Sequence, residues 1–227
     1  MQWNLIPLGD RACTVEFSDP GSATMRDLIH CVDAALRADT PTGVSAVVPA
    51  IRSITMHYNP MQTTLPVLGA RLDLMLGSLT VSAPIPRAPV RIPVCYGGEF
   101  GPDLESVAAA HDMSCDAVID AHTAVDYVVA MIGFLPGFPY LDGLSESLHT
   151  PRRDIPRTSV PAGSVGIGGG STGIYPFSSP GGWQLIGRSP RTLFNAHRLP
   201  PSLLQAGDHV RFVAIAHDQW DAQVNAA

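Results

Sequence analysis

Hydrophobic and polar residues follow two different periods in the first third of the chain. Residues 4–17 alternate around a Gly-Asp turn, which predicts two short strands. Residues 22–38 carry apolar side chains at helical spacing behind a capping serine, and further strands are expected at 44–48 and 53–58. A second helix is expected from a stripe that consists of Leu65, Leu68, Leu72, Met75, Leu76 and Leu79. These elements predict a small α+β sandwich over residues 1–84, which we expect to be ferredoxin-like.

The pattern changes after a proline-rich stretch, SAPIPRAP at residues 82–89, which lacks periodicity and is typical of a linker. Two short helices are expected at 104–111 and 115–122, and the apolar run DYVVAMIGF predicts a central strand. Short strands between glycine and proline turns follow, with the sequences GSVGIGG, STGIYP, WQLIG and DHVRFVAI. Many short strands with few helices predict a mainly-β barrel over residues 85–227.

The composition excludes several classes of function. The 227 residues carry a net charge of −6, and all 14 basic residues are arginine. General nucleic-acid binding needs clustered positive charge, and Schiff-base or phosphate-loop chemistry needs a lysine, which the chain lacks. The four cysteines are widely spaced, so neither a redox pair nor a zinc cluster is indicated. The sequence shows no leader and no run long enough to span a bilayer, so a cytoplasmic location is expected.

Charge is distributed unevenly along the second domain. Residues 99–146 contain nine acids and no arginine, whereas residues 152–211 contain seven arginines and two acids. One interpretation is a solvated surface with uneven charge. The other is an anion-binding or partner-binding face built from the later segment, and the residues alone leave both open.

Glycine, proline and aromatic residues are concentrated in a few segments, first in GFLPGFPYLDG at residues 133–143 and then in GIGGGSTGIYP and SPGGWQLIGR. Glycine lets a ligand approach backbone N–H groups, the planar fork of arginine suits a carboxylate or phosphate, and tyrosine and tryptophan can wall a pocket. Turns, surface ion pairs and core packing are the alternatives for the same residues. The segments therefore predict a surface for a small anionic or amide-like ligand without fixing a reaction.

Groups suited to proton transfer are few. His122 closes a predicted helix, where it is either a proton carrier or a cation that interacts with the helix dipole. Glu99, Asp103 and Asp142 can serve as bases or magnesium ligands, although their spacing does not require it. No Ser/His/Asp set and no metal-ligand cluster is predicted.

Long collinear motifs make the second domain resemble a known family. The stretches CYGGEFGPDL, GFLPGFPYLDGL, PRR…PR…VPAGSVGI, TGIYP, SPGGWQLIGR and GD.VRF, within residues 92–215, resemble allophanate hydrolase subunit 1. That family includes the B-type subunit of 5-oxoprolinase and the Kip-type kinase inhibitor. The resemblance implies a cyclophilin-like β-barrel for the second domain. It also implies two partners, a companion cyclophilin-like subunit and a lactam-processing subunit.

The function implied by this resemblance is that of a subunit of an ATP-dependent 5-oxoprolinase, which opens 5-oxoproline to L-glutamate. The chain is then expected to be inactive alone. ATP with magnesium is the implied cofactor, at a site shared with the partner subunit. The family also leaves open a regulatory module that inhibits a histidine kinase, and a subunit of a urea- or allophanate-processing enzyme.

The resemblance and the residue chemistry together assign roles within these motifs. His122, Arg157 and Tyr175 are expected to be catalytic. The residues expected to bind substrate are Phe134, Pro136, Gly137, Phe138, Tyr140, Arg152, Arg153, Gly169, Gly170, Ser171, Thr172, Trp183 and Arg188.

One departure from the family concerns the glycine loop, which in relatives usually reads GIAGGQTGIYP. Here Gly168 replaces an alanine and Ser171 replaces a glutamine. A serine hydroxyl reaches less far than a glutamine amide and offers fewer hydrogen bonds. The substrate therefore stays open at this position.

Overall fold

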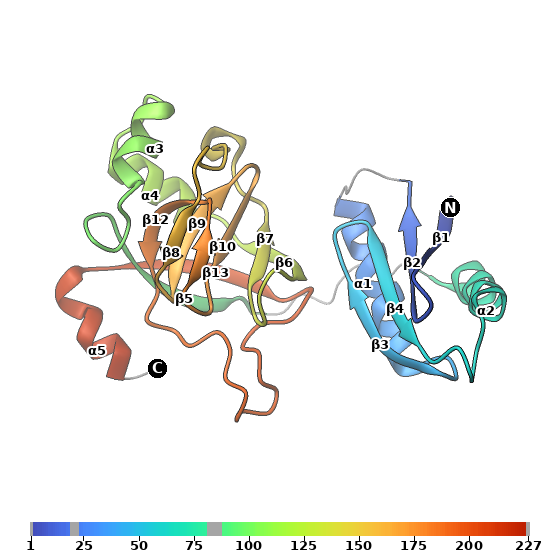
Figure 1. Ribbon diagram of the computed structural model, residues 1–227. Coiled ribbons are helices and arrows are strands. Elements are labelled where there is room, and N and C mark those ends of the chain that lie inside the picture. The colour runs from blue at the N-terminus through green and yellow to red at the C-terminus, as the bar shows by residue number, and fades with distance from the viewer. Residues whose placement is uncertain (1, 19–22, 81–87, 226–227) are drawn as a thin grey trace. The chain divides into compact units, whose positions relative to one another are not determined.

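A computed structural model gives the fold of residues 2–18, 23–80 and 88–225 (Figure 1). The chain divides into two units, residues 1–86 and residues 87–227, and each is described by itself. The boundary expected between residues 84 and 85 lies outside the described residues.

The first unit is a four-stranded antiparallel sheet with two helices. Its strands lie in the order β1-β2-β4-β3. The elements in chain order are β1 (Trp3–Leu8), β2 (Ala12–Phe17), α1 (Ala23–Ala38), β3 (Val44–Pro49), β4 (Ser53–Tyr58) and α2 (Leu65–Ser78). The strands and helices predicted from periodicity are therefore confirmed to within a few residues.

One face of this sheet forms the core of the first unit. Alternate residues of β2 and β4 are buried, and the register places Val15 opposite Ile54. The stripe of α1 and residues Leu68 and Leu72 of α2 join the same cluster, so both helices cover one face of the sheet. Burying such side chains stabilises the fold by about 1.5–3 kcal/mol each. This gain accounts for the alternation of apolar and polar residues along the strands.

The topology of the first unit differs from the expected ferredoxin-like order. A ferredoxin-like sandwich runs βαββαβ, whereas this unit runs ββαββα. The cause is the tight turn at Gly9, whose φ is +66°, because it pairs β1 with β2 before the first helix begins. The coarser α+β prediction holds.

The second unit contains a closed barrel in the strand order β10-β7-β6-β13-β5-β12-β9. The barrel strands are β5 (Val90–Tyr96), β6 (Tyr127–Ile132), β7 (Pro139–Asp142), β9 (Ser164–Gly168), β10 (Ser171–Ile174), β12 (Gln184–Arg188) and β13 (His209–Ile215). Strands β5 and β13 pair in parallel, and the other pairs are antiparallel. A barrel was expected, and closure leaves these strands without a free edge. The cyclophilin-like assignment stays a prediction.

Further elements surround the barrel. They are α3 (Leu104–Ala110), α4 (Cys115–Thr123), the 3-10 turns η1 (Glu146–Leu148) and η2 (His217–Gln219), and α5 (Trp220–Asn225). Helix α3 packs on β12 and helix α4 on β13. Strands β8 (Arg157–Val160) and β11 (Ser179–Gly181) form a separate two-stranded ribbon, with Arg157 opposite Gly181.

Three irregular features position the candidate site. A tight loop at residues 133–138 joins β6 to β7, and Pro139 begins β7, the position in a strand where proline is tolerated. Part of the GFLPGFPYLDG segment is thus a strand that the sequence analysis missed. A strap at residues 151–156 leads from the barrel into β8, and residues 182–183 lead from β11 into β12.

Candidate functional site

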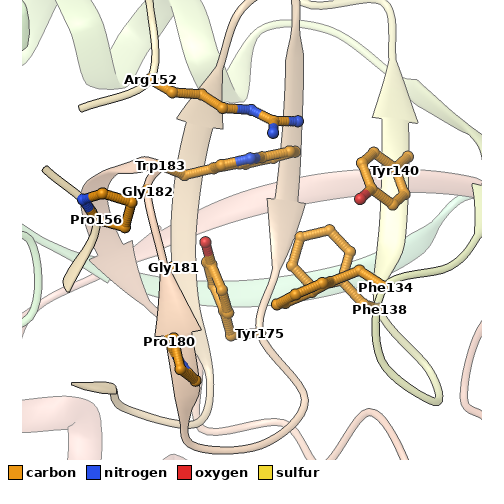
Figure 2. A pocket seen from close by; sticks show the side chains of 10 residues that line it. All are labelled: Phe134, Phe138, Tyr140, Arg152, Pro156, Tyr175, Pro180, Gly181, Gly182 and Trp183. Carbon is orange, nitrogen blue, oxygen red and sulfur yellow. The ribbon is translucent and has the colours of Figure 1, made fainter. Parts of the chain in front are cut away.

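A cavity of about 240 Å³ opens where the 133–138 loop, the strap and the β8–β11 ribbon meet (Figure 2). Drug-sized ligands occupy pockets of roughly 300–1,000 Å³, so this cavity suits a single small ring. Ten residues line it: Phe134, Phe138, Tyr140, Arg152, Pro156, Tyr175, Pro180, Gly181, Gly182 and Trp183. Six of them, the five aromatic residues and Arg152, were among the expected site residues.

The walls of the cavity are buried aromatic side chains. Phe138, Tyr175 and Trp183 are 1%, 1% and 5% exposed and belong to one small core cluster. The Phe138 ring meets Tyr175 edge-on at 5.1 Å between centroids and meets Trp183 edge-on at 5.4 Å. Edge-to-face contacts of this kind fix ring orientation, so the cavity is formed before any ligand arrives.

Two glycines let these rings lie against the backbone. A Cβ on Gly181 would lie 2.5 Å from the Tyr175 hydroxyl oxygen, and a Cβ on Gly168 would lie 2.6 Å from the Trp183 ring. At position 168, relatives in the family usually have alanine where this chain has glycine. An alanine there requires a different placement of the indole, so this departure shapes the wall of the cavity.

The 133–138 loop holds an exposed ring at the edge of the cavity. Phe134 has a φ of +65° and is 59% exposed, although bulky residues rarely adopt this conformation. The turn around it is closed by backbone hydrogen bonds, including Phe138 N–H to the Leu135 carbonyl at 3.0 Å. Strain of this kind costs about 1–3 kcal/mol and often accompanies function.

Polar groups reach the cavity at three points. The guanidinium of Arg152 lies over the Trp183 ring at 5.8 Å, and the hydroxyls of Tyr140 and Tyr175 point toward the space beneath that ring (Figure 2). Burial raises the pKa of Tyr175, while a backbone hydrogen bond at Trp183 and nearby arginines oppose this shift. Tyr175 is therefore a neutral donor at physiological pH.

Arg153 and Arg157 are engaged by a buried carboxylate. Asp103, 5% exposed, accepts a hydrogen bond from Arg157 at 2.7 Å and from Arg153 at 3.3 Å through Oδ1. Its Oδ2 accepts the Leu185 N–H at 2.6 Å. The sequence raised Asp103 only as a base or magnesium ligand, and nothing local signals a partner 50 to 82 residues away. Arg157, expected to be catalytic, here ties the ribbon to the start of helix α3.

Arg188 also lies outside the cavity. Its Nε donates to the Ala162 carbonyl at 2.8 Å, and its guanidinium stacks on Trp220 of α5 at 5.7 Å. Trp220 in turn contacts Phe100 at 4.5 Å between ring centroids. Arg188 therefore joins the barrel to the C-terminal helix.

The glycine loop turns between β9 and β10 and does not line the cavity. Gly169 has a φ of +66°, and a Cβ on Gly170 would meet the His149 ring at 3.1 Å. Ser171 opens β10 and is only partly buried. Pro136 and Gly137 lie in the 133–138 loop but are not among the lining residues, and Gly137 lies against Phe194. Substrate roles for these residues stay predictions.

His122, in helix α4, is packed in the core of the second unit and is not among the residues that line the cavity, so its catalytic role stays a prediction. It is fully buried, as is Thr172. Thr172 donates to the Gly166 carbonyl at 3.0 Å, so its oxygen accepts from His122 Nε2 at 2.9 Å. His122 Nδ1 then accepts from the Tyr96 hydroxyl at 2.8 Å. The neutral imidazole satisfies every partner, and burial lowers its pKa to about 3.

The cavity lining does not fit magnesium, because it contains no carboxylate. Across the described ranges, no three His, Cys, Asp or Glu side chains gather in a group that could hold a metal ion. None of the helices in residues 2–18, 23–80 and 88–225 combines the length and hydrophobicity that a membrane span requires.

Fold and site together define the class of protein: a two-unit chain with an α+β unit and a closed β-barrel unit that carries a small aromatic pocket. A family model for the carboxyltransferase domain, subdomain C and D, matches residues 3–204. The chain belongs to this family. The resemblance that the motifs suggested is therefore confirmed.

Similar proteins cover nearly the whole chain. The B-type subunit of 5-oxoprolinase from Bacillus subtilis is 41% identical over 98% of this chain and 97% of its own length, and the protein of the same name from Haemophilus influenzae is 43% identical over 92% and 97%. A solved structure of a conserved uncharacterized protein from Pyrococcus horikoshii is 40% identical, with a TM-score of 0.57, over 96% of this chain and 100% of its own.

More distant structures share the fold. The Kluyveromyces lactis urea amidolyase matches with a TM-score of 0.80 at 18% identity, over 98% of this chain and 15% of its own. At that identity the similarity shows the fold alone. In that protein the matching region is a small part of a much larger polypeptide.

The burial of His122 predicts an acid-sensitive barrel. Its folded-state pKa of about 3 lies below the ordinary value of 6.5, so the unfolded state binds more protons between these values. The free energy of unfolding should therefore fall as pH drops below 6.5, by up to about 1.4 kcal/mol per pH unit. Urea unfolding from about pH 7 to about pH 4 measures this slope.

His122→Gln should show a shallower slope, because the glutamine does not titrate. His197→Gln, at an exposed site, is the matched control and should keep the wild-type slope. Equal slopes in all three proteins would assign the acid sensitivity to other groups.

The contact between Gly168 and Trp183 predicts a coupled pair. Gly168→Ala should destabilise the protein by about 1–3 kcal/mol, because the new methyl group overlaps the indole. In a Trp183→Phe background the same change should cost less, since the overlapping indole atoms are gone. A double-mutant cycle from urea unfolding measures the coupling, and additive costs would show that the indole does not rest on Gly168.

The hydrogen bonds of Asp103 predict a large stability loss on its removal. Asp103→Ala should cost about 3 kcal/mol, because two guanidinium groups and the Leu185 N–H lose a buried acceptor. Asp126→Ala, which breaks the exposed pair with Arg211, is the control and should cost less than about 1 kcal/mol. Comparable losses in thermal unfolding would refute a special role for Asp103.

Proposed function

We propose that this chain is the pocket-bearing subunit of an ATP-dependent 5-oxoprolinase, the enzyme that opens 5-oxoproline to L-glutamate. The main support is the near full-length similarity, at 41–44% identity, to proteins named as B-type subunits of 5-oxoprolinase. Similarity to urea amidolyase is confined to the fold and favours no urea-processing role.

The cavity suits the chemistry of this substrate. 5-oxoproline is a single five-membered lactam ring with one carboxylate, and the cavity offers aromatic walls and one guanidinium at about the right size. The hydroxyls of Tyr140 and Tyr175 can donate hydrogen bonds to the lactam carbonyl, whose oxygen gains negative charge when the ring carbon is attacked. In this role the chain holds and polarises the lactam.

The pocket lacks the parts that a complete reaction needs. An amide carbonyl is a poor electrophile, and no nucleophile or titrating base lines the cavity. The lining also lacks a carboxylate that could hold the magnesium of ATP. In this proposal a companion cyclophilin-like subunit and a lactam-processing subunit supply the remaining groups, and the nucleotide binds with them or at a site that they share with this chain.

Reconstitution tests this function. The chain alone should hydrolyse neither ATP nor 5-oxoproline, whereas co-expression with its companion subunits should give ATP hydrolysis that depends on 5-oxoproline and matches glutamate formation. The companions without this chain provide the control and should be inactive. A fully assembled complex that forms no glutamate from 5-oxoproline would contradict the proposal.

A further inference from the structure

The arginines around the pocket divide into engaged and available groups. Arg153 and Arg157 are held by Asp103, and Arg188 is held by the Ala162 carbonyl and Trp220. Arg152 lines the cavity, and no carboxylate within the described part of the chain pairs with it. The sequence gives no reason to separate these four arginines, whereas their contacts in the structure do.

The backbone on both sides of Arg152 is fixed. The Gln184 amide donates to the Pro151 carbonyl at 3.0 Å, and the Arg153 N–H donates to the Gly182 carbonyl at 2.7 Å. The same Arg153 carries a side chain anchored to Asp103. The strap therefore holds Arg152 over the cavity without using its guanidinium for anchorage.

The side chain of Arg152 is oriented but its donors stay free. The guanidinium carbon lies 5.8 Å from the centroid of the Trp183 ring, within cation–π range (Figure 2). Arginine binds a carboxylate through two parallel hydrogen bonds in the plane of the guanidinium. Arg152, which makes no ion pair within the described part of the chain, therefore offers N–H groups at the aromatic cavity that suit a carboxylate on the edge of a ring.

We propose that Arg152 is the residue that selects the carboxylate of the ligand, so that the pocket accepts a single-ring lactam acid and discriminates against the same ring without its acid group. This inference rests on the proposed function and names the group that recognises its substrate. A carboxylate fits better than a phosphate, because a second negative charge would find no other cation in the lining.

The size of the discrimination follows from the bond type. A hydrogen bond between charged groups contributes enough to change affinity by about tenfold to one-hundredfold. 2-Pyrrolidinone, which is the 5-oxoproline ring without the carboxyl group, should therefore bind more weakly than 5-oxoproline by this factor. Removing the guanidinium should abolish the preference rather than weaken both ligands equally.

The experiment uses the assembled complex and three variants. Arg152→Gln should raise the KM for 5-oxoproline by about tenfold to one-hundredfold while leaving the inhibition constant of 2-pyrrolidinone and the KM for ATP within about twofold. Arg152→Lys keeps the charge without the planar fork and should recover part of the loss. Arg211→Gln removes a guanidinium that pairs with Asp126 outside the cavity and should leave all three constants unchanged.

A second measurement separates this inference from the proposed function. Calorimetric titration of the full chain with 5-oxoproline and with 2-pyrrolidinone reports the carboxylate preference without any turnover. A preference that Arg152→Gln abolishes would support the inference even in a complex that forms no glutamate. An equal loss for both ligands, a change confined to ATP, or a chain that binds neither ligand alone or in the complex would overturn it.

Discussion

The second unit depends on one buried carboxylate. Asp103 lies at the start of helix α3. It accepts hydrogen bonds from Arg153 in the strap, from Arg157 at the start of β8 and from the N–H of Leu185 in β12. These segments lie 50 to 82 residues away in sequence, yet each helps to position the cavity. A buried carboxylate is stable only when its oxygen atoms accept enough hydrogen bonds to replace those of water. Asp103 therefore holds the three segments that donate to it in one arrangement. The strap, the ribbon and the aromatic walls take their places relative to this contact.

The same contact explains why so few of the arginines face the cavity. An uneven charge distribution suggested either an anion-binding face or ordinary surface pairing; the structure shows the pairing for two arginines, and the anion-binding face stays a prediction. Arg153 and Arg157 pair with an acid from the acidic segment, whereas Arg152, between anchored neighbours, remains free to meet a ligand. Pairing with Asp103 thus leaves Arg152 as the guanidinium in the cavity lining, which suits a ligand with a single negative charge.

The elements could be predicted from local periodicity, because the side of a strand or helix that faces the core carries apolar residues at a regular spacing. The α1 helix, the strands around the Gly9 turn and most barrel strands follow from it. Strand β7 was missed because its first residue, Pro139, argues against a strand unless it stands at the beginning. The burial of His122 and the pairing of Asp103 depend on contacts between distant segments, so neither could be read locally. The aromatic residues of the pocket were found because bulky rings beside glycines are uncommon in a loop.

The side chains that line the cavity have a further consequence. No histidine, cysteine or carboxylate is among them, and burial raises the pKa of Tyr175. The lining therefore contains none of the side chains that commonly titrate near neutral pH. In the proposed function, the groups that transfer protons must then lie outside this cavity.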